Sequence, residues 1–151
     1  MASSGGFGFH DYLALTNLLY RYTNRIDAND NSDVPGLGHL GKATGSRTIY
    51  PDTNTPKTHH VTSNVRIRPD GPNRATGHSY FTIFQATDEL PLQCVVCGTY
   101  TDKYEKKDGV WGFVERRFDY RLIGDLTHHN VNIKVPRAPL ASGVRTPDNP
   151  Y

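Results

Sequence analysis

The sequence lacks the long apolar stretches and blocks of like charge that mark membrane and nucleic-acid proteins. None of its apolar runs approaches the roughly 18 residues of a membrane-spanning helix. Its 17 Lys and Arg residues oppose 15 Asp and Glu residues, a formal net charge of +2, and no five like charges follow one another. A nucleic acid or a membrane surface usually requires a concentrated basic patch. We therefore expect neither as a partner, and a small neutral ligand fits this composition better.

Signals for secretion, nucleotide binding and serine hydrolysis are also missing. The first nine residues contain neither a basic segment nor the apolar core of a signal peptide, which predicts a cytoplasmic protein. No glycine-rich phosphate loop, Walker motif or G-x-S-x-G elbow is present. The usual signatures of nucleotide chemistry and of serine hydrolases are therefore absent.

Cysteine is scarce, and the two that occur form a C-x-x-C pair at Cys94 and Cys97. The surrounding residues, Leu92 to Tyr100, are β-branched and aromatic and predict a strand. Residues three apart on a regular strand point to opposite faces, so we interpret both as structural thiols.

A second candidate for metal binding, His128-His129, is also weak, because adjacent histidines do not easily chelate one ion and no further ligands complete a set. We expect no metal site.

The length and average composition of the chain predict one domain. With 151 residues and 36% hydrophobic content, the chain can bury one core but not two. Residues 1–9 are small and glycine-rich and predict a flexible tail, and residues 136–151, with four of the ten prolines, predict a second tail. The domain itself is expected over residues 10–135.

One helix and four strands follow from the periodicity of the sequence. Apolar residues three and four apart predict an amphipathic helix from Asp11 to Ala28. Residues 29–57 break every pattern with Gly, Pro, Asn and Asp, and form a functional lid, a disordered segment or a region of shortened helices. Strands are predicted at His59–Arg68, Ala75–Thr87, Leu92–Lys106 and Val110–Leu122. A helix followed by a strand meander favours an α+β fold with a strongly curved antiparallel sheet.

Candidate site residues are polar side chains on elements that otherwise form the core. Tyr22 and Asp27 lie on the predicted helix, about 140° apart around its axis. They could meet at a cavity rim near the helix end, or Tyr22 could pack in the core while Asp27 caps the next turn. His59 and His60 open the next strand, so only one of them can face a cavity. The even-numbered side of that strand is the more polar, which leaves a solvated His60 and a pocket-facing His60 equally open.

Arg116 is a further candidate, in the Arg116-Arg117 pair on the last strand. The alternative is a solvated guanidinium that lies over the sheet. If Asp27 meets a histidine, the carboxylate orients an imidazole that transfers a proton near neutral pH. A tyrosine hydroxyl can then donate a hydrogen bond to developing negative charge. This chemistry needs no cofactor and suits elimination, dehydration or isomerisation of a compact, mostly apolar substrate.

Four motifs occur in the order seen in SnoaL-like proteins of the nuclear transport factor 2-like superfamily, which the chain resembles over about residues 10–130. They are the helix end Leu18–Asp27, the strand start Thr58–Asn64, the hairpin Gly98–Trp111 and the segment Gly124–His128. The hairpin is especially similar to that of the hexachlorocyclohexane dehydrochlorinases. The resemblance implies a cone-shaped α+β barrel, in which a curved, mainly antiparallel sheet wraps around the N-terminal helix.

The resemblance also implies a site and a function. In the dehydrochlorinase, bile-acid dehydratase and scytalone dehydratase branches, an Asp at the helix end pairs with a His at a strand start. These positions match Asp27 and the expected general base His60. Tyr22 matches the tyrosine of the dehydratase branch, and Arg116 matches an arginine of the dehydrochlorinase site. We therefore expect a cofactor-independent lyase or isomerase that acts on a small hydrophobic, polycyclic or polyketide-like substrate.

The resemblance also leaves a non-catalytic alternative. The segment between Asp27 and His60 is shorter than in those relatives, which would open the pocket to water. The superfamily also contains proteins that only bind ligands or assemble, so a non-catalytic binding or assembly module is the alternative. Folds of this kind commonly pair through the open face of the sheet, which implies a homodimer or homotrimer.

Overall fold

A computed structural model describes residues 6–41 and 47–129 of the chain. The elements are α1 (Phe9–Ala28), η1 (Gly38–Gly41), β1 (Thr58–Pro69), β2 (Arg74–Gln85), β3 (Gln93–Lys107) and β4 (Val110–Ile123). Each predicted boundary of the helix and of the strands lies within two residues of the observed one. The predicted tail over residues 136–151 and part of the tail over residues 1–9 lie outside the described residues.

Helix α1 forms where the apolar periodicity predicts it, but begins two residues earlier, at Phe9. Leu15, Leu18, Leu19 and Tyr22 are buried and form one stripe along it. The Asp11 carboxylate accepts a hydrogen bond from the backbone N–H of Gly8, which satisfies a free donor at the helix start. Asn29 ends the helix in the left-handed conformation, with φ of 51°. Asp27 therefore lies on the last helical turn.

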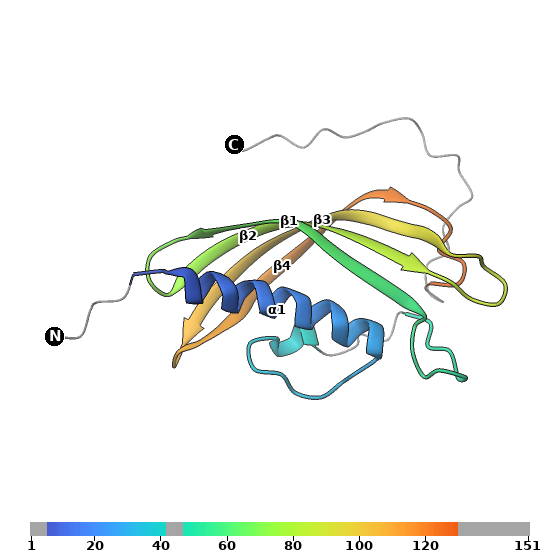
Figure 1. Ribbon diagram of the computed structural model, residues 1–151, viewed down its shortest axis with the longest axis horizontal. Coiled ribbons are helices and arrows are strands. Elements are labelled where there is room, and N and C mark those ends of the chain that lie inside the picture. The colour runs from blue at the N-terminus through green and yellow to red at the C-terminus, as the bar shows by residue number, and fades with distance from the viewer. Residues whose placement is uncertain (1–5, 42–46, 130–151) are drawn as a thin grey trace.

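The four strands form one antiparallel sheet in the order β1-β2-β3-β4. Figure 1 shows that this sheet arches over α1, which lies along its concave side. The sheet is curved and, over the described residues, does not close on itself. The predicted α+β architecture, with a curved sheet around the N-terminal helix, is confirmed. It places the last turn of α1 beside the start of β1, where the candidate residues lie.

Aromatic side chains fill the space between the sheet and α1. Phe81 on β2 and Tyr100 on β3 stack with ring centroids 4.6 Å apart, and both are buried. Gly98 makes this packing possible, because a Cβ there would lie 2.1 Å from the Asp119 carbonyl oxygen and 2.9 Å from the Phe81 ring. The core therefore depends on the close approach of β3 and β4 at one glycine.

A β-bulge divides strand β1 into two halves. The pairing with β2 shifts by one residue between Ser63 and Arg66, and Asn64 within the bulge has φ of 52°. The partly buried positions are even-numbered before the bulge, at 58, 60 and 62, and odd-numbered after it, at 65 and 67. The more polar, even-numbered side of β1 therefore faces the core at the start of the strand.

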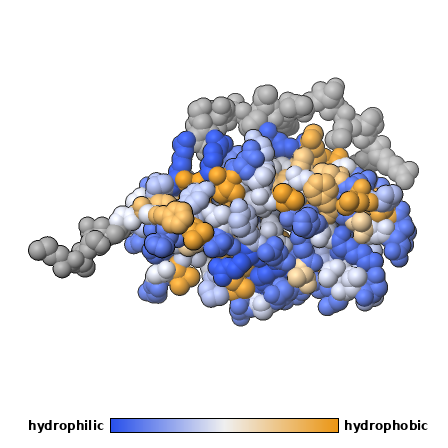
Figure 2. Space-filling model, in the orientation of Figure 1, coloured by the Kyte–Doolittle hydropathy of each residue, from blue (hydrophilic) through white to orange (hydrophobic). Residues whose placement is uncertain are grey.

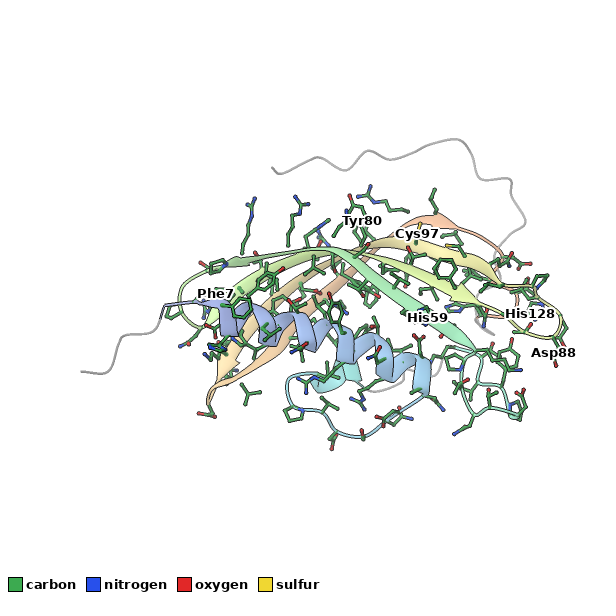
Figure 3. The ribbon with its side chains drawn as sticks, viewed as in Figure 1. Phe7, His59, Tyr80, Asp88, Cys97 and His128 are labelled. Atoms are coloured by element: carbon green, nitrogen blue, oxygen red, sulfur yellow. The ribbon has the colours of Figure 1, made fainter. Side chains whose placement is uncertain are left out.

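A second bulge, in β3, changes the expectation for the two cysteines. Ile83 pairs with Val96, but Phe84 pairs with Cys94, so one extra residue, Val95, interrupts the ladder. Cys94 and Cys97 therefore lie on the same face of the sheet, not on opposite faces as regular alternation predicted. Both thiols are free. In Figure 3, Cys97 and Tyr80 lie on the side of the sheet away from α1.

The segment between α1 and β1 contains little regular structure where it is described. The helical turn η1 packs on β4, where the Phe113 backbone N–H donates to the Gly36 carbonyl. A bridge joins Tyr50 to Thr55 just before β1. Figure 2 shows a mostly hydrophilic face on which apolar residues occur singly or in small groups. Among the described residues, no helix is both long and apolar enough to cross a membrane.

Candidate active site

The structure brings Asp27 and His60 together at the end of the sheet where α1 ends. The Nδ1 atom of His60 lies 2.5 Å from one Asp27 carboxylate oxygen, and the backbone N–H of His60 donates to the other at 2.8 Å. The Thr58 hydroxyl donates a third hydrogen bond at 2.7 Å. Asp27 is therefore held by the strand start through both of its oxygens.

The alternation along β1 decides which histidine faces inward. The His60 side chain is only 6% exposed, whereas His59 is an exposed residue. With Nδ1–H directed at Asp27, Nε2 is the ring nitrogen of His60 that remains available as a base. Burial would raise the pKa of Asp27, but its hydrogen bonds from His60 and Thr58 outweigh this and hold the pKa below the usual value. The carboxylate is thus ionised at neutral pH.

Arg116 is buried on the concave side of the sheet and is not the solvated guanidinium of the alternative interpretation. Its side chain is fully buried and makes two hydrogen bonds of 2.8 Å to the Asp102 carboxylate. Its guanidinium carbon lies 4.4 Å from the Tyr22 ring centroid, 4.0 Å from that of Tyr100 and 4.5 Å from that of Phe113. Its Nη1 atom has no hydrogen-bond partner. An aromatic box therefore encloses this cation.

Tyr22 packs with its ring against the guanidinium of Arg116. Its ring also packs edge-on against Tyr100, and its side chain is part of the core cluster. Burial raises the pKa of the Tyr22 hydroxyl, and the nearby positive charge of Arg116 offsets part of this effect. The phenol therefore stays protonated and able to donate a hydrogen bond. Tyr22 therefore packs in the core, as one interpretation expected, but Asp27 bonds to the start of β1 and does not cap the next turn.

Asp102 was not identified from the sequence, although a signal was present. It lies between Tyr100 and Tyr104 on the inward face of β3, and only 1% of it is exposed. The Tyr104 hydroxyl donates to it at 2.8 Å. An acidic residue between two aromatics at a spacing of two on a strand predicts a buried carboxylate that needs a cationic partner.

Arg47 and His129 are two further residues that sequence reasoning missed as neighbours of this site. Burial lowers the pKa of Arg47, and the charges of Tyr22 and Asp27 partly offset this effect. The Thr48 backbone N–H, next to Arg47, donates to the His129 carbonyl. Burial lowers the pKa of His129, and the positive charges of His60 and Arg47 lower it further. The His128-His129 pair had a sequence signal, but only as a possible metal ligand. Arg47 lies in the segment without periodicity and had none.

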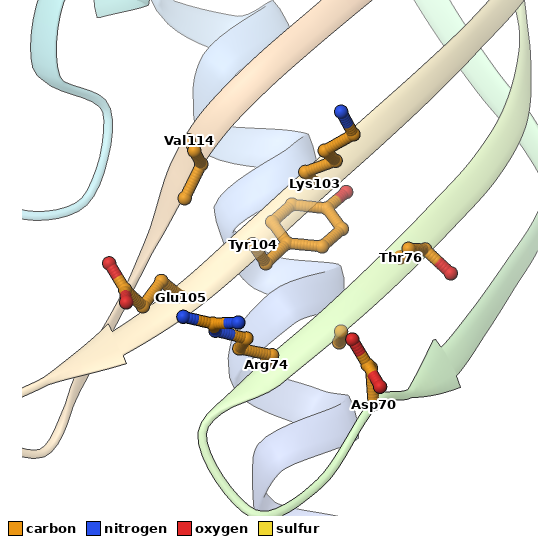
Figure 4. A pocket seen from close by; sticks show the side chains of 8 residues that line it. Asp70, Arg74, Thr76, Lys103, Tyr104, Glu105 and Val114 are labelled. Carbon is orange, nitrogen blue, oxygen red and sulfur yellow. The ribbon is translucent and has the colours of Figure 1, made fainter.

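Among the described residues, no group of three or more His, Cys, Asp or Glu side chains is placed to hold a metal ion. A shallow depression elsewhere on the sheet is lined by charged residues, including Asp70, Arg74 and Lys103. Figure 4 shows this depression with α1 behind the sheet, so it opens on the face away from the helix. It is separate from the Asp27–His60 pair.

Comparisons with known proteins identify the family. The sequence profile of a SnoaL-like domain matches residues 39–117, a range that includes His60 and Arg116 but begins after Asp27. No curated protein gives a significant match.

Three solved structures illustrate the structural similarity. A protein of unknown function from Mycobacterium tuberculosis is 24% identical with a TM-score of 0.55, and the match covers 76% of this chain and 74% of the other. A protein assigned as a scytalone dehydratase from Novosphingobium aromaticivorans is 21% identical with a TM-score of 0.51, covering 75% and 85%. A hexachlorocyclohexane dehydrochlorinase from Novosphingobium barchaimii is 16% identical with a TM-score of 0.55, covering 85% and 96%.

At these identities the solved structures show a shared fold, and the family follows from the profile, which matches more than half of the chain. The sheet and helix described above are those of the nuclear transport factor 2-like cone. The chain belongs to the family of SnoaL-like domains.

Proposed function

We propose that this protein is a cofactor-independent lyase or isomerase that removes a proton from carbon in a small hydrophobic substrate. The observation that carries the proposal is the contact between His60 Nδ1 and Asp27, which leaves Nε2 of a nearly buried imidazole as the base. His60 takes the proton as general base, and Asp27 orients the ring and stabilises the imidazolium that forms. A dehydratase and a dehydrochlorinase among proteins of this fold are consistent with this reaction class.

In this proposal Tyr22 and Arg116 stabilise the negative charge that proton removal creates on the substrate. The protonated Tyr22 hydroxyl can donate to an oxygen on which charge develops, and Arg116 adds a fixed positive charge beside it. Two hydrogen bonds to Asp102 fix the guanidinium before substrate arrives, so little reorganisation is needed during the reaction. We propose that His60 and Asp27 handle the proton while Tyr22 and Arg116 stabilise the enolate-like charge.

The aromatic wall of the concave face supports a flat, apolar substrate. Phe118 and Tyr120 on β4 stack with centroids 6.3 Å apart, next to the buried rings of Phe81 and Tyr100. Both remain partly exposed, Phe118 at 37% and Tyr120 at 57%. Aromatic faces that are open on one side bind planar rings well. A polycyclic or polyketide-like ketone therefore fits this wall.

Proton exchange at carbon tests the proposal without knowledge of the natural substrate. A panel of hydrophobic ketones and β-hydroxyketones is incubated with the protein in D₂O, and loss of the α C–H signal is followed by NMR. We expect His60→Ala to slow exchange by about 10²- to 10⁴-fold, the usual contribution of a general base. His59→Ala is the matched control, because the neighbouring side chain is exposed on the other face, and it should leave the rate unchanged.

Two further observations separate the proposal from its alternative. Added imidazole should restore part of the exchange rate of His60→Ala, which a merely unfolded variant would not show. Exchange that is as fast in His60→Ala as in the wild type would remove the proposal. Ligands that bind without any exchange across the panel would favour the alternative, a binding or assembly module.

We further propose a cytoplasmic homodimer or homotrimer that pairs through the outer face of the sheet. The supporting feature is a set of exposed apolar side chains on that face, including Val61, Tyr80 and Leu122. Light scattering after size-exclusion chromatography should give two or three times the chain mass of 16.9 kDa. Tyr80→Asp should shift the mass towards the monomer, whereas a wild-type protein that elutes as a monomer would contradict the proposal.

A further inference from the structure

Arg47 and His129 lie beside the proposed base but take no part in the proposed proton transfer. The Nε atom of Arg47 and the Nδ1 atom of His129 are both buried and have no hydrogen-bond partner. Burial lowers the pKa of both residues; the charge of Asp27 acts against this effect at Arg47, and the charge of His60 acts with it at His129. The two nitrogens without partners thus belong to residues that interact electrostatically with the proposed Asp27–His60 pair.

Hydrogen bonds to the carbonyls of His128 and His129 join the segment of Arg47 to the turn of His129. The His128 carbonyl accepts hydrogen bonds from the Tyr50 hydroxyl at 2.8 Å and from the Gln85 side-chain amide at 3.1 Å. The Thr48 backbone N–H donates to the His129 carbonyl at 3.1 Å. The backbone next to Arg47 is therefore bonded directly to the turn that carries His129.

The hydrogen bond from Gln85 also places this turn near the start of β1, which carries His60. Gln85 pairs with Thr58 across the β1–β2 ladder, and His60 pairs with Ile83, one inward position further along. Gln85 is 1% exposed and reaches both Pro56 and the turn. In Figure 3, His59 and His128 lie at the same end of the sheet. The backbone of Thr48 and of His129 therefore lies at the end of the sheet where Asp27 and His60 meet.

The hydrogen-bonding groups at this end are not all satisfied. Asp27 is its described carboxylate and already accepts bonds from Thr58 and His60, whereas the buried Nε of Arg47 and Nδ1 of His129 have no hydrogen-bond partner. Arg116 is paired with Asp102 instead. An entering carboxylate would supply two acceptor oxygens, one for a guanidinium N–H and one for an imidazole N–H.

We propose that Arg47 and His129 form a subsite for a carboxylate group on the substrate, next to the carbon that His60 deprotonates. The inference deepens the proposed function and rests on it: the substrate is a hydrophobic carboxylic acid with an acidic C–H near the carboxylate. Arg47 supplies the fixed charge, and His129 donates a directional hydrogen bond. A carboxylate matches the single fixed positive charge and the two unpartnered nitrogens of the subsite.

The test compares two probes that differ only in charge, 2-naphthoate and the neutral 2-naphthamide, by titration calorimetry at neutral pH and low salt. We expect wild-type protein to bind naphthoate about 10- to 100-fold more tightly, the usual range for hydrogen bonds to a charged group. Arg47→Gln should abolish this preference, and His129→Asn should reduce it. Arg47→Lys, which keeps the charge, should retain part of it. Arg21→Gln, an exposed arginine on α1, is the matched control and should retain all of it.

The result is independent of turnover. His60→Ala removes the proposed base, yet it should still bind naphthoate more tightly than naphthamide. If that preference is found and His60→Ala leaves proton exchange unaffected, the proposed function fails and the carboxylate subsite stands. Equal affinities for the two probes in the wild type, no binding of naphthoate at millimolar concentration, or a preference that survives Arg47→Gln would each overturn the subsite.

Discussion

Arg116 and Asp102 place a full ion pair inside the aromatic core. Removing both charges from water is costly, and here the cost is offset by two hydrogen bonds of 2.8 Å, a third from Tyr104 and the faces of three rings. Burial would lower the pKa of Arg116, but the hydrogen bonds and charge of Asp102 outweigh this and raise it. Arg116 therefore stays ionised in the core, with Asp102 as its counterion.

Removal of Arg116 should reveal the free-energy cost of burying the Asp102 carboxylate without its cation. Arg116→Met leaves Asp102 buried without its cation, and we expect the free energy of unfolding to fall by about 3–5 kcal/mol. Urea denaturation followed by tryptophan fluorescence measures the change, with Arg117→Met, an exposed neighbour on the opposite face, as the control. In the double variant Arg116→Met/Asp102→Leu, much of the loss should be recovered. A single variant within 1 kcal/mol of the control would show that Asp102 is not truly desolvated.

Individual residues were only partly predictable. Asp27 and His60 were identified because a known family has an Asp at the helix end and a His at a strand start, while the polar alternation of β1 alone left His60 undecided. Asp102 could have been found from its position between two inward tyrosines. Arg47 could not, because its place at the site depends on tertiary hydrogen bonds of Thr48 and Tyr50 that leave no periodic trace.

At the scale of elements, Asp11 joins the start of α1 to the β3–β4 hairpin. Its carboxylate accepts hydrogen bonds from the Lys106 ammonium and the Trp111 indole N–H, each 2.8 Å long, besides that from Gly8. These hydrogen bonds lower the pKa of Asp11 far below its usual value, and burial opposes them only weakly. The same side chain therefore begins the helix and fixes its angle to the sheet.

This contact predicts a particular dependence of stability on pH. Because the folded-state pKa is lowered, the unfolded chain takes up the proton first, so the stabilisation is complete well above the unfolded value of 3.8 and is lost as the pH falls towards the folded value. Asp11→Asn should cost about 1–3 kcal/mol at pH 7 and show a weaker fall in stability below pH 4 than the wild type. Chemical denaturation at a series of pH values measures both effects. Asp33→Asn, an exposed residue, serves as control, and parallel pH profiles for wild type and Asp11→Asn would contradict the prediction.

The elements themselves were predicted well, because their signals are local. Apolar spacing of three and four marks α1, and β-branched and aromatic runs between turn residues mark the strands. The bulges at Asn64 and Val95 were not predicted, since a bulge changes the facing of side chains without any change in composition. The wrong expectation that the two cysteines face opposite sides arises from the bulge at Val95, and the bulge at Asn64 explains why the polar alternation of β1 left the facing of His60 open.

At the scale of the whole molecule, the packing of β3 against β4 and the aromatic core depends on the close contact at Gly98. A methyl group there would meet the Asp119 carbonyl of β4 and the Phe81 ring at once, and the former is backbone that cannot rotate away. We expect Gly98→Ala to lower the stability by about 1–3 kcal/mol, the usual cost of overpacking. It should also move β4, and with it Tyr120, so naphthoate affinity should fall as well.

Thermal unfolding and calorimetry on the same samples measure these two effects of Gly98→Ala. Gly6→Ala is the matched control, because a Cβ at Gly6 would meet no atom within 4 Å. A Gly98→Ala variant with unchanged melting temperature would show that β3 and β4 can separate without consequence for the cone.

The bulge in β1 also governs how this protein can be compared with its relatives. Counting back from the partly buried Ile67 in steps of two leads to His59, whereas the extra residue near Asn64 makes His60 the residue that meets Asp27. A gap-free alignment to a relative whose strand lacks this bulge would thus place one histidine over the wrong column. The same single residue would mislead any transfer of this site into another scaffold, because a graft that omits the bulge but copies the numbering would turn the base towards solvent.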